Sequence, residues 1–209
     1  MVKASMPNSS PTERKARTEN WFSSDAKFDQ LYPASVQALT KRHWTPLGVA
    51  RKAAAFLAAE NNARILDIGS GAGKFCLAAG HYKPNAFYYG VEQRTSLVYN
   101  AETARLILRL ENVSFIPGNF TRLDSRDYDH FYFYNSFYEN MVGTDKIDNS
   151  IVYSGELYNY YTRYLYQQLG QKPAGTRLAT YHSMEDEIPP AYHVVGAEFD
   201  NLLKFWIKI

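Results

Sequence analysis

The sequence predicts an α/β protein with a doubly wound, mostly parallel sheet of seven strands. Apolar runs that are too short for helices recur along the chain, and longer stretches with helical periodicity separate them. A glycine-rich turn follows the first run, and a stretch that can be helical comes directly after it. The last two runs are joined by Asp200-Asn201 alone, which predicts an antiparallel C-terminal hairpin. The predicted strands cover residues 65–68, 86–92, 113–116, 131–134, 176–182, 192–199 and 202–209.

Helices are predicted before the first strand, and the chain divides into three regions. Residues 1–20 are polar, and we expect a flexible tail there. Residues 21–60 are expected to form helices that cover the cleft at the edge of the sheet. Among them, Thr45 is predicted to cap a helix whose first residue is Pro46. Residues 61–209 are predicted to form the main domain.

The composition indicates one domain of ordinary size. The chain has 209 residues, of which 45% are hydrophobic, so it can bury a sizeable core. Its net charge of +2 gives no electrostatic indication of nucleic acid as an obligatory partner. A single cysteine excludes an internal disulfide framework, and neither a signal peptide nor a long apolar span is visible. We therefore expect a cytoplasmic protein without a membrane partner. The sequence does not indicate the oligomeric state.

The glycine-rich turn begins just after Asp67, near the end of the first predicted strand. Gly69, Gly71 and Gly73 alternate with small residues, among them Ser70. Such a turn brings backbone N–H groups and a helix N-terminus close to a ligand, with no Cβ in the way. A dinucleotide-binding turn needs glycine at position 74, where this chain has lysine, and a phosphate-binding loop needs glycine at position 68 and a hydroxyl at position 75. A tight turn without a ligand is the alternative.

The segment Leu-Asp-Ile-Gly-Ser-Gly-Ala-Gly, residues 66–73, resembles the first motif of class I S-adenosylmethionine-dependent methyltransferases. The resemblance extends over residues 45–209 and implies a Rossmann-like fold with S-adenosylmethionine as the cofactor. It implies that the turn residues named above hold this cofactor, and that Asp67 fixes the turn or reaches a cationic ligand. In related enzymes a threonine just before a helix contacts the methionine carboxylate, a role that Thr45 would combine with capping.

Glu92 ends the second predicted strand, about 25 residues after Asp67. Folds that bind nucleosides have an acidic residue at the end of this strand. A carboxylate there can accept hydrogen bonds from both ribose hydroxyls. A solvated glutamate at a strand end is the alternative. After the third strand, Asn119 and Phe120 occupy the position where class I methyltransferases hold adenine. The resemblance implies that Asn119 meets the base and Phe120 flanks its face. An ordinary Pro-Gly turn with a capping asparagine is the alternative.

The fourth predicted strand runs directly into Asn135-Ser136-Phe137-Tyr138. Ligands of open α/β sheets bind beyond the carboxyl ends of the strands, so we expect this segment beside the transferred methyl group. It resembles the Asn-Pro-Pro-Tyr motif of amino-group methyltransferases, with serine and phenylalanine in place of the two prolines. It also resembles the Asn-Asn-Phe segment of non-SET histone lysine methyltransferases of the disruptor-of-silencing type.

We predict that Asn135 and Tyr138 are the catalytic residues and that Asn135 also contacts the cofactor. Asn135 can accept N–H bonds from a substrate amine, and Tyr138 can stack on the substrate or face the sulfonium charge. Glu139 is the nearest candidate base, and a solvated glutamate at a helix start is its alternative. His182 and Glu185 follow the fifth strand, where they line the substrate mouth or form a plain loop.

The sequence therefore predicts an S-adenosylmethionine-dependent methyltransferase that acts on an amino nitrogen, with a protein lysine as the leading candidate. A small molecule or a nucleic acid is the alternative methyl acceptor. A methyltransferase fold that has lost catalysis and serves as a binding or assembly partner is the alternative from another class. The five histidines are dispersed without metal-ligand spacing, so no metal site is predicted.

Overall fold

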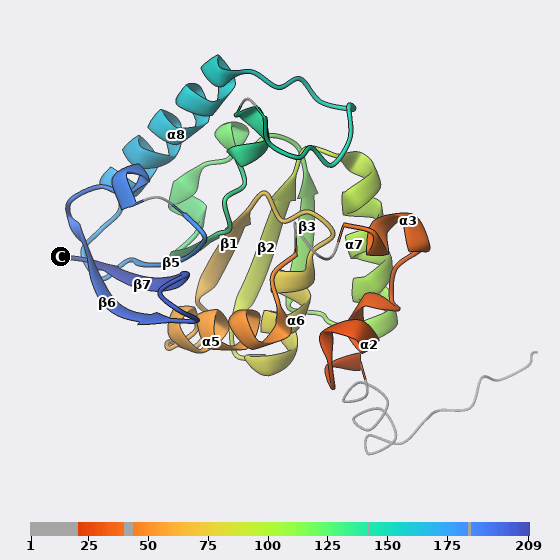
Figure 1. Ribbon diagram of the computed structural model, residues 1–209. Coiled ribbons are helices and arrows are strands. Elements are labelled where there is room, and N and C mark those ends of the chain that lie inside the picture. The colour runs from red at the N-terminus through yellow and green to blue at the C-terminus, as the bar shows by residue number, and fades with distance from the viewer. Residues whose placement is uncertain (1–20, 40–43, 142, 184) are drawn as a thin grey trace, which may run out of the picture.

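The computed structural model describes residues 21–39, 44–141, 143–183 and 185–209. The expected flexible tail, residues 1–20, lies outside the described residues. The sheet has seven strands in the order β3-β2-β1-β4-β5-β7-β6 (Figure 1). The first five strands pair in parallel, and β7 is antiparallel to both of its neighbours, which confirms the predicted fold class. The strands are β1 (Arg64–Ile68), β2 (Phe87–Glu92), β3 (Val113–Pro117), β4 (His130–Phe133), β5 (Arg177–Tyr181), β6 (Tyr192–Glu198) and β7 (Leu203–Lys208).

Helices cover both faces of the sheet, because its parallel strands are apolar on both sides. Ile65 and its neighbour Leu66 on β1 belong to two separate cores: Ile65 packs with α5, α6 and α7, and Leu66 packs with α8. Figure 1 shows α8 across the sheet from α5 and α6. Within the described parts of the chain, no helix combines the length and apolarity that crossing a bilayer requires. The α-helices are α2 (Asp25–Asp29), α3 (Ala34–Gln37), α5 (Leu47–Leu57), α6 (Lys74–Tyr82), α7 (Thr95–Leu108) and α8 (Gly155–Gly170), and the 3₁₀ turns are η1 (Phe120–Arg122), η2 (Ser125–Asp127), η3 (Tyr138–Asn140) and η4 (Glu185–Glu187).

Strand β1 is the point at which the strand order reverses. It pairs with β2 on one side and with β4 on the other, so the chain leaves it in two directions across the sheet. A switch of this kind opens a crevice beyond the carboxyl ends of the strands. The glycine turn after Ile68 and the segments after Glu92 and Phe133 all meet at this edge.

Helix α5 is capped by a residue far away in the chain. It begins at Leu47 with Pro46 in the N-cap position, and no side chain there forms a capping hydrogen bond. The predicted cap by Thr45 is therefore wrong, because its hydroxyl pairs with the hydroxyl of Tyr132 at 3.0 Å. The Leu47 N–H donates instead to the Asp25 carboxylate at 2.9 Å. This long-range cap left no local signal in the sequence.

The N-terminal helices pack against the glycine turn. The Lys74 ammonium is buried and forms ion pairs with the carboxylates of Asp25 and Asp29, each at 2.7 Å. The Tyr32 hydroxyl donates to the carbonyl of Ala72, which lies in the turn, at 2.8 Å. Because buried charges are costly to leave unpaired, these contacts fix α2 and the residues after it on the turn.

Candidate active site

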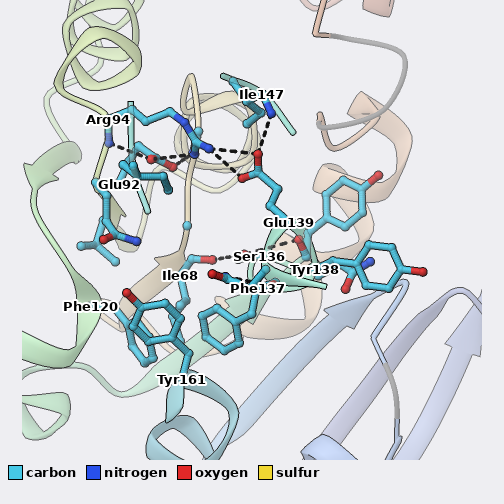
Figure 2. A pocket seen from close by; sticks show the side chains of 18 of the residues that line it. Ile68, Glu92, Arg94, Phe120, Ser136, Phe137, Tyr138, Glu139, Ile147 and Tyr161 are labelled. Carbon is cyan, nitrogen blue, oxygen red and sulfur yellow. Dashed lines mark hydrogen bonds and ion pairs between the residues drawn. The ribbon is translucent and has the colours of Figure 1, made fainter. Parts of the chain in front are cut away.

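A cavity of about 610 Å³ opens at the carboxyl edge of the sheet (Figure 2). Its walls come from the glycine turn, the residues after β2, the segment after β4 and the 139–153 loop, of which residues 139–141 and 143–153 are described. Its volume lies within the roughly 300–1,000 Å³ that small-molecule sites occupy. The candidate residues from the sequence that line the cavity are Gly69, Gly71, Glu92, Phe120, Asn135, Tyr138, Glu139 and His182.

The glycine turn lies against the end of β2. The N–H groups of Gly69 and Ser70 both donate to the Val91 carbonyl at 3.0 Å, and the Gly71 N–H donates to Oε2 of Glu92 at 3.1 Å. Gly71 has a φ of +54°, and a Cβ built on it would meet no atom within 4 Å. The turn therefore presents bare backbone to the cavity at Gly71, which is the surface that close approach of a ligand requires.

Glu92 is buried at the cavity wall and is held by its neighbour Arg94. Its Oε1 accepts the Arg94 backbone N–H at 2.9 Å and also contacts Nη1 of the guanidinium at 3.5 Å. Burial raises the pKa of the Glu92 carboxyl, and the hydrogen bonds and charge of Arg94 oppose that rise. The carboxyl group is thus fixed in position with its edge toward the turn.

The Arg94 guanidinium ties the 139–153 loop to the end of β2, as Figure 2 shows. Its Nη2 donates to both carboxylate oxygens of Glu139 at 2.9 Å and to the Tyr153 hydroxyl at 2.5 Å, and its Nε donates to Asp148 at 3.2 Å. The Ile147 N–H also donates to Glu139, at 2.6 Å. The surrounding carboxylates raise the pKa of Arg94. Glu139 is thus a partly buried ion-pair partner of Arg94, which neither of its two expected roles anticipated.

Three rings form an aromatic wall of the cavity. Phe120 and Phe137 stack with their centroids 5.1 Å apart, and Tyr161 packs against them at 5.8 and 5.5 Å. Asn119 lies behind this wall, where its amide donates to the Tyr161 hydroxyl at 2.8 Å and its Oδ1 accepts the Thr121 N–H at 3.0 Å. Asn119 therefore caps η1, which is the alternative that the sequence left open.

Asp67 lies buried beneath the glycine turn. Its Oδ2 accepts a hydrogen bond from the Cys76 thiol at 3.6 Å, and burial raises its pKa to about 8. Asp67 therefore keeps its proton at neutral pH. A smaller cavity of about 30 Å³, lined by Thr45, Asp67 and Ser70, shares Gly69 with the larger one. The Ser70 hydroxyl is buried beside Gly90 of β2 and has no hydrogen-bond partner among the described residues.

The segment of residues 135–138 lies beside the glycine turn. The Ser136 hydroxyl donates to the Ile68 carbonyl, and a Cβ on Gly69 would lie 2.5 Å from the Ser136 Cβ. Asn135 has a left-handed backbone with a φ of +46°, and its carbonyl accepts the Tyr138 N–H at 3.1 Å. No described residue forms a hydrogen bond with the Asn135 side chain. Tyr138 is 41% exposed at the rim of the cavity.

A family model described as a methyltransferase domain matches residues 59–158. Over these residues the chain is similar to methyltransferase domains. The match includes the glycine turn, Glu92 and the segment of residues 135–138. No curated protein matches the sequence.

The methyltransferase domain has the fold of several solved structures. TrmN from Thermus thermophilus aligns with a TM-score of 0.55 at 18% identity, over 83% of this chain and 52% of TrmN. An RNA methyltransferase from Salinibacter ruber, in complex with S-adenosyl-L-homocysteine, aligns with a TM-score of 0.52 at 17% identity, over 79% and 93% of the two chains. A point mutant of MtNAS in complex with S-adenosylmethionine aligns with a TM-score of 0.52 at 12% identity, over 94% of this chain and 71% of MtNAS. The chain spans about half the length of TrmN, and at these identities the likeness shows the fold alone.

The larger cavity has room for a ligand of the size of S-adenosylmethionine. The bare backbone at Gly71, the buried carboxyl group of Glu92 and the aromatic face of Phe120 surround one continuous space. Gly73 lies in neither cavity, because its Cα faces the Phe115 ring behind the turn. Gly71 of the turn thus faces the cavity, whereas Gly73 packs against the interior of the protein.

The sequence interpretation missed several residues of the candidate site. Arg94 follows a strand-end acid by two positions, so a local signal for its pairing with Glu92 was present. Asp148 and Tyr153 reach the site only through ion pairs and hydrogen bonds with Arg94, from 54 and 59 residues away in the chain. No local pattern could have placed them.

Proposed function

We propose that the methyltransferase domain transfers a methyl group from S-adenosylmethionine to an amino nitrogen, with a protein lysine as the specific candidate. The observation that carries the proposal is the Asn135 side chain, which lines the cavity and has no hydrogen-bond partner among the described residues. A carboxamide oxygen in this position can accept N–H bonds from an amine and turn the nitrogen lone pair toward the methyl group.

The residues that hold the cofactor are part of the proposal. Gly71 would let the backbone approach the ligand, Glu92 would accept the ribose hydroxyls, and Phe120 would flank the adenine ring. Thr45 and Ser70, at the smaller cavity, would meet the polar end of the methionine moiety. The buried and unpartnered hydroxyl of Ser70 supports this assignment, because a buried polar group without a partner is costly unless a ligand satisfies it.

The chain contributes alignment to the reaction, and the bound cofactor supplies an activated methyl group on a sulfonium. The hydrogen bond from Ser136 to the Ile68 carbonyl holds Asn135 next to the glycine turn. Tyr138, half-exposed at the rim, is placed to stack on an entering acceptor. Such positioning supplies most of the catalysis that an in-line displacement needs.

Cofactor binding is tested by calorimetric titration of S-adenosylmethionine and S-adenosylhomocysteine into the wild type and Glu92→Ala. We expect the dissociation constant to rise by about 10- to 100-fold in the variant, because two hydrogen bonds to a charged acceptor are lost. Glu102→Ala on α7, outside the cavity, is the matched control. Absence of binding by the wild type would refute the proposed function.

The methyl acceptor is tested with isotopically labelled cofactor and lysine-containing proteins and peptides, with mass spectrometry to locate the product. We expect Asn135→Ala to lower the transfer rate while its affinity for S-adenosylmethionine stays near that of the wild type. Asn100→Ala, on the far side of α7, is the control. RNA belongs in the same panel because TrmN and the Salinibacter ruber enzyme are similar in fold. Labelling of RNA or a small molecule without any labelled lysine would overturn the amine assignment. Binding without transfer to any acceptor would favour an inactive binding protein.

A further inference from the structure

An amine acceptor must lose a proton before it can attack a methyl group, and the carboxylates identified above do not suit this task. Glu92 is held by the backbone N–H groups of Gly71 and Arg94. Glu139 is bound to the Arg94 guanidinium and to the Ile147 N–H. The oxygens of both carboxylates are thus already occupied by donors of the chain, which leaves neither group turned toward an entering amine. The base must therefore come from another part of the cavity wall.

His182 lies on that wall, directly after the end of β5. Its backbone has a φ of +55°, and its N–H donates to the Leu202 carbonyl at 3.0 Å. The imidazole packs edge-on against Tyr181, with centroids 4.4 Å apart, and lies 5.8 Å from the ring of Tyr134. Tyr134 immediately precedes Asn135 and lines the same cavity. The imidazole is thus fixed between β4 and β5, at the sheet edge where the acceptor would enter.

We propose that His182 is the general base that removes the proton from the acceptor amine. The inference rests on the proposed function and deepens it. The imidazole takes one proton from R–NH₃⁺, and the resulting R–NH₂ uses its lone pair to form the N–CH₃ bond as the C–S bond of the sulfonium breaks. The bond electrons stay on sulfur, which gives S-adenosylhomocysteine and R–NH₂CH₃⁺. The protonated His182 then returns its proton to solvent, so the net reaction releases one H⁺.

The surroundings of His182 favour a neutral imidazole at the start of the reaction. Partial burial lowers its pKa below the ordinary value, so the ring is unprotonated at neutral pH and free to accept a proton. The titratable groups around it are Tyr134, directly after β4, and Tyr181 at the end of β5, with Tyr138 and Asp145 lining the same cavity. Behind it, Lys204 on β7 is neutralised by an ion pair with Glu185.

The test uses variants that keep the left-handed backbone at position 182. Asparagine and glycine both tolerate such a φ, so His182→Asn and His182→Gly remove the imidazole without added strain. The exposed His193 on β6 provides the control His193→Asn. The probes are Nα-acetyl-lysine amide and a lysine-containing peptide with labelled S-adenosylmethionine, and transfer is followed from pH 5.5 to 9.5.

We expect kcat to fall roughly 100-fold or more in His182→Asn, with an unchanged dissociation constant for S-adenosylmethionine. Added imidazole should restore activity in His182→Gly and leave the wild type unaffected. The wild-type profile should lose activity at acid pH through a group that the variants lack. Unchanged rates and pH profiles in both variants would overturn the role of His182 while leaving the methyltransferase intact. Cofactor binding without transfer to either probe would overturn the inference together with the amine assignment.

Discussion

Replacing two glycines of the turn by alanine separates the packing of the turn from its access to the ligand. In Gly73→Ala, the new Cβ would lie 2.4 Å from Cζ of Phe115 and 2.9 Å from the Cβ of Ala101, at a φ of +83°. The left-handed backbone costs about 1–2 kcal/mol for alanine, and overpacking adds roughly 1–3 kcal/mol. We therefore expect the free energy of unfolding to fall by about 2–5 kcal/mol.

Gly71→Ala is the matched variant, because its Cβ meets no atom within 4 Å and its φ is +54°. Only the cost of the left-handed backbone applies to this variant, so we expect a loss of about 1–2 kcal/mol in the free energy of unfolding. The added methyl group would stand in the cavity instead, where it should weaken S-adenosylmethionine binding at least about tenfold, or 1.4 kcal/mol.

Equilibrium urea unfolding followed by circular dichroism measures the two stabilities, and calorimetric titration measures the affinity. Equal destabilisation of the two variants would refute the packing argument at Gly73. Wild-type affinity in Gly71→Ala would show that the cofactor does not approach the turn at this residue.

Two further predictions concern the buried charges. Arg94→Lys keeps the positive charge but loses the several N–H donors of the guanidinium. We therefore expect the free energy of unfolding to fall by roughly 3 kcal/mol and proteolysis within the 139–153 loop to become faster. An unchanged cleavage rate would show that Arg94 does not hold this loop. Asp67 has its pKa raised to about 8 in the folded protein, so the folded state holds a proton that the unfolded state releases near pH 4. Between these values this group makes stability fall with rising pH, by on the order of 1 kcal/mol per unit. The melting temperature of Asp67→Asn, relative to that of the wild type, should therefore increase from pH 5 to pH 8. A constant difference between the two melting temperatures over this range would contradict the raised pKa.

The parts of the fold that local patterns encode were predictable from the sequence. The run of residues 65–68 is apolar and bounded by glycine, so its identity as a buried central strand followed from its length and composition. The cap of α8 is equally local, because the Ser154 side chain accepts the N–H of Leu157 three residues later. Both depend on residues close together in the chain.

Features that depend on distant residues were not predictable in the same way. The Asp25 carboxylate caps α5 from 22 residues away, and Thr45, which looked like the local cap, faces Tyr132 instead. The ion pair of Glu139 with Arg94 spans 45 residues and changes a candidate base into a structural anchor. In each case a tertiary contact overrode a sound local preference.

The position of β7 in the sheet has a consequence for how the protein is made. It follows β6 in the chain but lies inside the sheet, between β5 and β6. During synthesis on the ribosome, β5 emerges with an unpaired edge and must wait for β7. Exposed strand edges promote association with other chains, so this interval is the vulnerable period of biogenesis. Slower translation or scarce chaperones in that interval should lower the yield of native protein even when the finished fold is stable.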